Sequence, residues 1–186
     1  VNRSTTGDIT LAVPSGSIGY WIERLLSRGV PYEGPTKRFG ESVLSFTDPD
    51  GYRWIRHTFG GSKAPVLCLA GNHDLPEQMR AALKDPPFQV GGEYEFGRWL
   101  VVMLDTWIAT KASGRLGEEQ LTRLRETLRT HRNHHVLVCL HHHPIPMRSK
   151  WLDQVGLKDS EEFLRLVREH SNVRGVLWGH VHQSLD

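Results

Sequence analysis

Residues 65–74 read PVLCLAGNHD, and our expected fold rests first on these ten residues. It starts as an apolar run typical of a strand and ends in a polar loop that opens with Gly71. Two later apolar runs, at 136–140 and 173–178, are also followed closely by histidine. Because ligand sites in open α/β sheets lie beyond the strand ends, we expect these three loops to build one site.

Strand and helix patterns alternate from residue 51 onward, which predicts an α/β architecture. Between residues 116 and 130, Leu121, Leu124 and Leu128 recur on one face of an amphipathic helix. The other helices are expected at 52–59, 75–84 and 160–167, and the strands at 65–70, 99–104, 136–140 and 173–178.

The first fifty residues carry a different pattern and contain none of the eleven histidines. Apolar residues between Ile18 and Leu26 follow helical spacing, and Gly29 is expected to end that helix. The sequence DPDG at 48–51 is a strong turn signal, and the change of pattern there predicts a boundary between domains. Strands are expected at 9–13 and 43–46, and a loop at 33–40.

Composition and charge predict a globular protein of the cytoplasm. The formal net charge of +2 gives no electrostatic reason to expect nucleic acid as a partner. No apolar run is long enough to span a membrane, and the N-terminal residues lack the pattern of a secretory signal. Cys68 and Cys139 each lie inside an apolar run, which favours buried thiols over a disulfide. The sequence leaves the oligomeric state open.

The three loops offer ligands for divalent metal ions. Imidazole nitrogens and an amide oxygen, with no thiolate beside them, suit Mn, Fe, Zn or Co. His180 and His182 are two residues apart, so on an extended segment both side chains can point to the same side and reach neighbouring ions. His142 and His143 are interpreted as polar lining of the site, and Asp105 as a turn residue.

The ordered motifs are specific enough to indicate a family. A given tetrapeptide arises by chance only about once in 10⁵ positions, so GNHD at 71–74 followed by GHVH at 179–182 is not a coincidence. Residues 51–186 resemble the calcineurin-like metallophosphoesterase superfamily, and more narrowly its bacterial class III 3',5'-cyclic-AMP phosphodiesterases. The narrower resemblance rests on LAGNHDLP at 69–76, HHHPIP at 141–146, SKWLD at 149–153 and LWGHVHQ at 177–183.

The resemblance implies a centre with two divalent ions of the Mn, Fe or Zn type. Asn72, His141 and His180 would ligate one ion, and His182 would ligate the other. Two ions about 3.5–4 Å apart would stabilise the attacking and leaving oxygens of an in-line displacement at phosphorus by a metal-bound hydroxide. For 3',5'-cyclic AMP, the product of this hydrolase would be 5'-AMP.

The resemblance also implies the catalytic and substrate-binding residues. His73 would meet the phosphoryl oxygen and help the leaving alkoxide depart, and Asp74 would orient the His73 imidazole. The substrate, a small cyclic nucleotide, would contact Asn72, His73 and His182.

Two motifs of the family are not found in their expected order. Its first strand carries Asp-x-His and its second Gly-Asp, which supplies the carboxylate that bridges both ions. No Asp-x-His precedes Asn72, and the only Gly-Asp before it is Gly7-Asp8, so Asp8 is the single candidate for the bridge. The second ion is therefore expected to be weakly held or missing.

The N-terminal segment resembles another superfamily. The stretches VPSGS at 13–17, GPTKRFGE at 34–41 and FTDPDG at 46–51 are similar to one βαβββ module of the vicinal-oxygen-chelate proteins, near glyoxalases and ring-cleaving dioxygenases. Where that family has its metal-binding His and Glu, Asp8 and Ile55 stand here. We therefore expect two parts: residues 1–50, a glyoxalase-like fragment, and residues 51–186, an incomplete phosphoesterase domain.

These observations give one expected fold and three functional hypotheses. The fold is a layered α/β sandwich of the metallophosphoesterase type, truncated, with an N-terminal βαβ-type fragment and bare sheet edges that favour association. The first hypothesis is a metal-dependent phosphodiesterase. The second is a catalytically impaired chimeric remnant that binds one metal or a nucleotide weakly, and the third is a functional glyoxalase or dioxygenase half-module.

Overall fold

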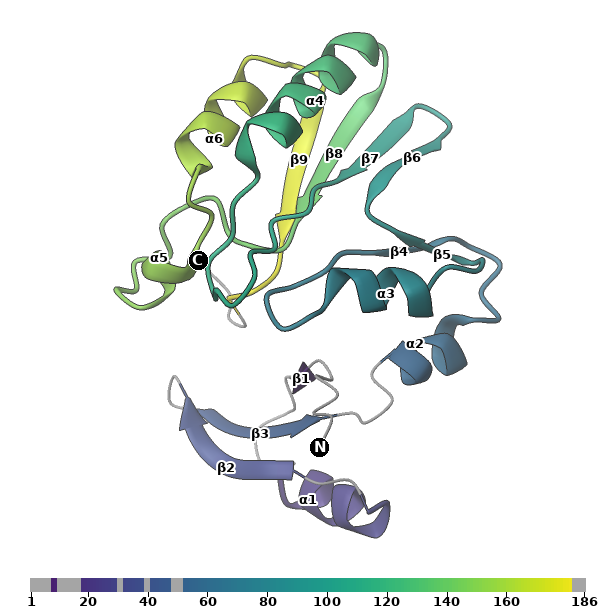
Figure 1. Ribbon diagram of the computed structural model, residues 1–186, viewed down its shortest axis with the longest axis vertical. Helices are drawn as coiled ribbons and strands as arrows, with labels where there is room; N and C mark the ends of the chain where they lie inside the picture. Colours follow the sequence, from purple (N-terminus) through teal and green to yellow (C-terminus); the bar gives the residue numbers. More distant parts are fainter. Residues whose placement is uncertain (1–7, 10–17, 30–31, 39–40, 48–51, 182–186) are drawn as a thin grey trace.

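A computed structural model describes residues 8–9, 18–29, 32–38, 41–47 and 52–181. Within these residues the strands form three separate sheets that follow one another along the chain (Figure 1). Helices and strands alternate through the second and third sheets, which confirms the expected mixed α/β class. None of the described helices is long and apolar enough to cross a membrane.

The first sheet is antiparallel and has the order β1-β3-β2. Its elements are β1 (Asp8–Ile9), α1 (Ile18–Ser27), β2 (Tyr32–Arg38) and β3 (Glu41–Thr47). α1 contacts β3 and is followed by Gly29, whose φ of 65° suits the end of a helix. Of the strand expected at 9–13, only Ile9 is among the described residues.

The expected loop at 33–40 is wrong, because residues 32–38 form β2. The pairing of β2 with β3 shifts register between Glu33 and Thr36, where Gly34 and Pro35 stand. Proline has no N–H for a ladder hydrogen bond and is tolerated in sheets at such irregularities. The turn-forming residues that suggested a loop therefore mark a bulge within a strand.

The second sheet pairs β4 (Val66–Cys68) with β5 (Phe88–Val90) in parallel. α2 (Tyr52–Phe59) precedes this sheet, and α3 (Pro76–Ala82) connects its strands, starting at a proline whose fixed φ suits the first helical turn. Ala70, Met79 and Leu83 are the buried centre of a small core here. Side chains from both helices and both strands pack against that centre: Tyr52, Ile55, Cys68, Phe88 and Val90.

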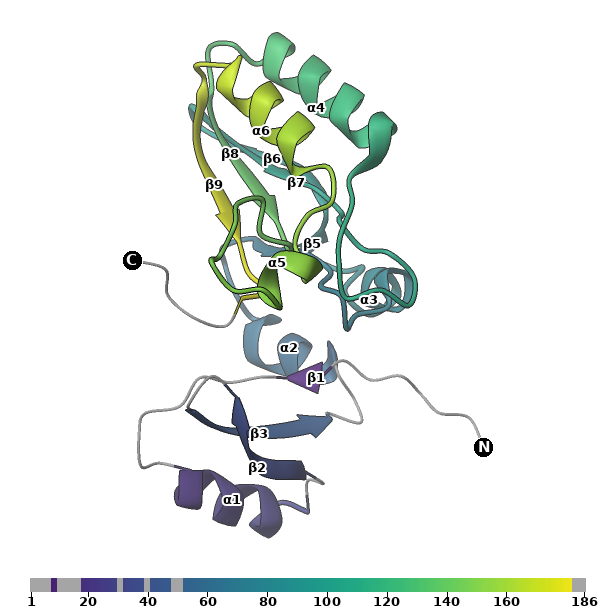
Figure 2. The same cartoon turned by 90° about the vertical axis from the view of Figure 1, so that its left-hand side faces the viewer.

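The third sheet has the order β6-β7-β8-β9, with β6 antiparallel to β7 and the other neighbours parallel. Its strands are β6 (Gly92–Phe96), β7 (Trp99–Met103), β8 (His135–Leu140) and β9 (Val173–Trp178). α4 (Gly117–Thr130) and α6 (Ser160–Arg168) lie side by side on one face of this sheet, and the short α5 (Leu152–Val155) precedes α6 (Figures 1 and 2).

The main core lies between this sheet and its two helices. Leu121, Leu124 and Leu128 of α4 are all buried in it, as their spacing predicted. Phe163 and Leu166 of α6 complete the helical side of the core. β7 and β8 contribute the buried residues of the sheet side: Leu100, Val102, Val136, Val138 and Leu140.

Both cysteines are free and only partly buried. Burial raises the pKa of each thiol, so both stay protonated near neutral pH.

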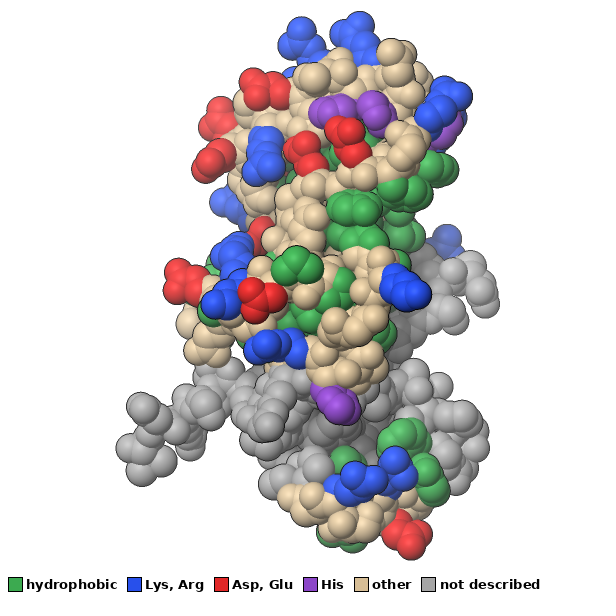
Figure 3. All heavy atoms as spheres, turned by 90° about the vertical axis from the view of Figure 1, so that its right-hand side faces the viewer, with side chains coloured by type: hydrophobic (Ala, Val, Ile, Leu, Met, Phe, Trp, Pro, Cys, Tyr) green, Lys and Arg blue, Asp and Glu red, His purple; other side chains and the backbone are tan. Residues whose placement is uncertain are grey.

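Histidine and acidic side chains gather near one end of the molecule (Figure 3). His131, which directly follows α4, has its Nε2 3.1 Å from Oε1 of Glu95 and its ring beside that of His134.

Asp159 joins the N-terminal ends of α4 and α6. It directly precedes α6, and its Oδ2 accepts a hydrogen bond from the backbone N–H of Gly117 at 2.8 Å. The N–H of Leu116 lies 3.1 Å from both carboxylate oxygens. A carboxylate at this position satisfies N–H groups that α4 leaves without helical partners.

We expect Asp159→Ala to lower the free energy of unfolding by about 1–2 kcal/mol, because it removes this cap. Urea denaturation followed by circular dichroism would measure the loss. Glu126→Ala, an exposed position on α4, is the control and should change the stability by less than about 0.5 kcal/mol. Equal effects of the two substitutions would contradict the capping role.

Candidate metal centre

Three loops meet at the ends of β4, β8 and β9, as the strand pattern predicted. Asn72 comes from the loop after β4, His141 directly follows β8, and His180 lies two residues beyond β9. All three side chains are partly buried. Residues more than a hundred positions apart in the chain are thereby brought into one group.

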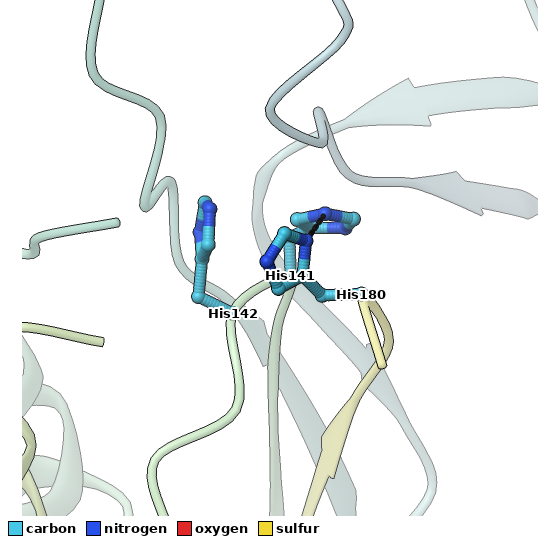
Figure 4. Close-up of side chains that lie close together, drawn as sticks. All are labelled: His141, His142 and His180. Carbon is cyan, nitrogen blue, oxygen red and sulfur yellow. Dashed lines mark hydrogen bonds between the residues drawn. The ribbon is translucent and has the colours of Figure 1, made fainter. Parts of the chain in front are cut away.

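Three donor atoms form a nearly equilateral triangle. Nε2 of His141 lies 3.0 Å from Oδ1 of Asn72 and 3.1 Å from Nδ1 of His180. The third side, between Nδ1 of His180 and Oδ1 of Asn72, is 3.1 Å. Figure 4 shows the His141 and His180 rings turned toward one another at these atoms, with His142 beside them.

Hydrogen bonds can join at most two sides of this triangle. An amide oxygen only accepts, and each ring nitrogen either donates or accepts. If both nitrogens donate to Asn72, no hydrogen bond joins the two rings; if either one is deprotonated, its lone pair faces the amide oxygen. A cation that receives one lone pair from each atom binds all three. Imidazole and amide donors also suit borderline divalent ions, so these residues fit a metal ion.

His142 lies beside the triangle, but its nitrogens are committed elsewhere. Nδ1 lies 2.7 Å from Oγ1 of Thr106, and Nε2 lies 3.2 Å from the carbonyl oxygen of Ala112. A carbonyl only accepts, so Nε2 carries the proton and Nδ1 accepts from the threonine hydroxyl. The three histidines His141, His142 and His180 could by proximity share an ion, since their nearest nitrogens lie within 4.8 Å of one another. The contacts of His142 make Asn72 the better third ligand.

Burial keeps His142 neutral. Desolvation, with the neighbouring His141, lowers its pKa to about 4. The ring fills its space so closely that a Cβ at Gly114 would collide with it. His143 is also buried, and burial lowers its pKa. It packs against Gly156, where a Cβ would lie 2.7 Å from its Nε2. Both rings line the site from within the protein.

His73 and Asp74 belong to the same loop as Asn72 and have different surroundings. The His73 side chain is exposed to solvent. The Asp74 carboxylate accepts hydrogen bonds from the Tyr52 hydroxyl and from the backbone N–H of Gly71, each at 2.8 Å. The orienting contact from Asp74 to His73 that the resemblance implied stays a prediction. Tyr52 was missed from the sequence, which carries no local signal that links it to a residue 22 positions away.

The remaining candidates make other contacts or lie outside the described residues. His182 is outside them. Asp8 lies in β1, paired with Thr47 of β3. Asp105 accepts from the N–H of Trp107 at 2.9 Å and pairs with Arg80 at 3.2 Å, as a turn residue does. Among residues 8–9, 18–29, 32–38, 41–47 and 52–181, the group that could share an ion contains histidines and no carboxylate.

Comparison with known proteins places this geometry in a family. The family described as calcineurin-like phosphoesterase matches residues 6–184. The 3',5'-cyclic adenosine monophosphate phosphodiesterase CpdA of Haemophilus influenzae is 36% identical over 148 residues, covering 79% of this chain and 54% of the relative. CpdA of Escherichia coli K12 is 33% identical over 136 residues, covering 73% and 50%.

A probable cyclic nucleotide phosphodiesterase of Synechococcus is 34% identical over 136 residues, covering 73% of this chain and 53% of the relative. The chain thus spans about half the length of the curated relatives it matches. The family match, in contrast, runs through nearly the whole chain and includes all three loops of the triangle. This chain therefore belongs to the calcineurin-like phosphoesterase family.

Proposed function

We propose that this chain is a metal-dependent phosphoric diester hydrolase that acts on a cyclic nucleotide, converting 3',5'-cyclic AMP to 5'-AMP. The observation that carries the proposal is the triangle of Asn72, His141 and His180, with sides of 3.0–3.1 Å. Family membership supports hydrolysis of a phosphoester, and the names of the relatives support a cyclic nucleotide as the substrate. We place the reaction in the cytoplasm, with no nucleic acid or membrane as a partner.

A divalent ion held by these three residues would supply a Lewis acid and activate water as the nucleophile. We propose that this ion is of the Mn, Fe or Zn type, since imidazole and amide donors suit these ions, with His182 as a ligand of a second ion.

The protein side chains then orient the substrate and move one proton. Water attacks phosphorus opposite the 3' oxygen, the new P–O bond forms as the water loses one proton to solvent, and the P–O3' bond breaks. We assign His73 to protonate the departing 3' oxygen, since an imidazole holds or releases a proton near neutral pH. Its exposed side chain is adjacent to Asn72, so it is accessible to a ligand from solvent. Asp74 holds the loop, and substrate contacts are assigned to Asn72, His73 and His182.

A second candidate is a remnant that binds one ion or a nucleotide weakly and does not turn over substrate. One observation favours it: among the described residues, the group that could hold an ion consists of His141, His142 and His180. This group has no carboxylate that could bridge two ions. A single ion can still bind the phosphate, but it lacks the partner that a two-metal displacement uses to stabilise the second oxygen. Turnover separates the two candidates.

We also propose that residues 1–50 are a glyoxalase- or dioxygenase-like fragment attached to the phosphoesterase part at 51–186. In support, within the described residues β1, β2 and β3 form their own sheet and pair with no strand of the other two sheets. The calcineurin-like phosphoesterase match, in contrast, begins at residue 6 and includes this segment. The proposal is therefore tested by whether residues 1–50 can be separated physically from the rest of the chain.

We expect Mn²⁺ to be required for hydrolysis of cyclic AMP, and His73→Ala to lower kcat by about 100-fold or more, because it removes the proton donor. The Mn²⁺ dissociation constant of the variant should stay within about twofold of the wild-type value, since His73 is not a ligand of the triangle. Turnover by the variant equal to wild type would contradict the role of His73. Mn²⁺ binding without turnover in the wild type would favour the remnant.

We expect Asn72→Ala, His141→Ala and His180→Ala each to weaken Mn²⁺ binding by more than about tenfold, because each removes one of the three donors. Isothermal titration calorimetry would give the dissociation constants. His57→Ala is the control, an exposed histidine of α2, and should bind Mn²⁺ like the wild type. Loss of affinity in the control alone would place the ion elsewhere.

We expect limited proteolysis of the whole chain to cut first near the proposed boundary at residues 48–51, leaving a fragment that begins close to Tyr52. Mass spectrometry would identify the fragment, and its Mn²⁺ affinity should match that of the intact chain because all three donors lie within it. First cuts distributed through the third sheet would contradict a division at this position.

A further inference from the structure

We propose that Tyr52, the first residue of α2, is a positioning residue for the metal ligand Asn72 and acts through the carboxylate of Asp74. This inference rests on the proposed metal site. Tyr52 is an addition to the residues of that site: it lies some twenty positions before the GNHD motif and touches none of the three donor atoms of the triangle.

The Asp74 carboxylate closes the turn that carries Asn72. Oδ2 of Asp74 accepts from the backbone N–H of Gly71 at 2.8 Å. The backbone N–H of Asp74 donates back to the carbonyl of Gly71 at 3.2 Å. Asn72 is the second of the four residues spanned by these two hydrogen bonds, so its backbone position follows the position of Asp74.

Tyr52 holds the other oxygen of the same carboxylate. Its hydroxyl donates to Oδ1 of Asp74 at 2.8 Å. A carboxylate held at one oxygen only can still rotate about its side-chain torsions, whereas one held at both is fixed. Burial and the neighbouring Asp74 raise the pKa of Tyr52 well above its usual range, so the phenol keeps its proton and stays a donor.

The tyrosine hydroxyl is itself fixed by the small core of the second sheet. The half-buried Tyr52 packs against the buried cluster of Ala70, Met79 and Leu83, together with Ile55 from the same helix. The packed core therefore fixes the phenol of Tyr52, the phenol fixes the Asp74 carboxylate, and the carboxylate fixes the turn. A flexible surface side chain would hold the turn less firmly, because forming the same hydrogen bond would cost it rotamer freedom.

The turn has little room to move against the rest of the site. Gly71 is buried, and a Cβ at that position would lie 2.7 Å from Cε1 of His141. The turn backbone is thus in contact with the ring whose Nε2 lies 3.0 Å from Asn72. A shift toward His141 meets the ring, and a shift away separates the two donors. Affinity for an ion should therefore depend on how firmly the turn is held.

The experiment compares Mn²⁺ affinity in the full chain for the wild type, Tyr52→Phe and Ile55→Ala by isothermal titration calorimetry, with a thermal unfolding curve for each. Tyr52→Phe keeps the ring in the core and deletes only the hydroxyl. Ile55→Ala loosens the same helix in the same cluster without touching the hydrogen bond, so it measures what a loss of packing does.

We expect the dissociation constant to rise about tenfold in Tyr52→Phe, and to stay within about twofold of wild type in Ile55→Ala while its unfolding temperature falls. An unchanged dissociation constant in Tyr52→Phe would overturn the inference and leave the proposed function standing. Equal weakening in both variants would also overturn it, since packing alone would then explain the effect. A wild-type chain that binds no Mn²⁺ would reject the proposed function, and this inference with it.

Asp74→Ala tests the same link if Tyr52→Phe does not fold. Alanine offers no oxygen to the N–H of Gly71 or to the hydroxyl of Tyr52. The same rise of about tenfold in the dissociation constant is expected. Binding as tight as wild type would overturn the inference.

Discussion

Three donor atoms lie 3.0–3.1 Å apart, and no arrangement of protons joins all three pairs by hydrogen bonds. Asn72, His141 and His180 come from loops at the ends of three strands in two different sheets. The β4–β5 pair and the four-stranded sheet must therefore keep a fixed relation if the donors are to stay together. A bound cation would receive a lone pair from each donor and so stabilise the folded chain.

Buried polar contacts around the donors limit how far each can move. His142, next to His141, is held between Thr106 and Ala112, and Gly114 leaves the space that its ring needs. Asp74, two residues after Asn72, is held between Gly71 and Tyr52. The loops of Asn72 and His141 are thus each fixed by hydrogen bonds to a segment distant in sequence. Such supporting contacts orient metal ligands and commonly affect binding as strongly as a ligand does.

The sequence predicted the parts of this structure that depend on local pattern. Spacing alone placed Leu121, Leu124 and Leu128 in the core, and the apolar runs before His141 and His180 became β8 and β9. β5 and β6 were missed because one is three residues long and the other carries Gly92, Glu93 and Glu95, which are poor strand formers. The contacts of Tyr52 with Asp74 and of Thr106 with His142 join residues 22 and 36 positions apart. Only the folded chain brings them together.

The most direct test of the metal centre is an anomalous difference map from crystals of the chain soaked in Mn²⁺. We expect a peak about 2.1 Å from each of Oδ1 of Asn72, Nε2 of His141 and Nδ1 of His180. A map with no peak at the triangle, in crystals where those three side chains are well ordered, would contradict it.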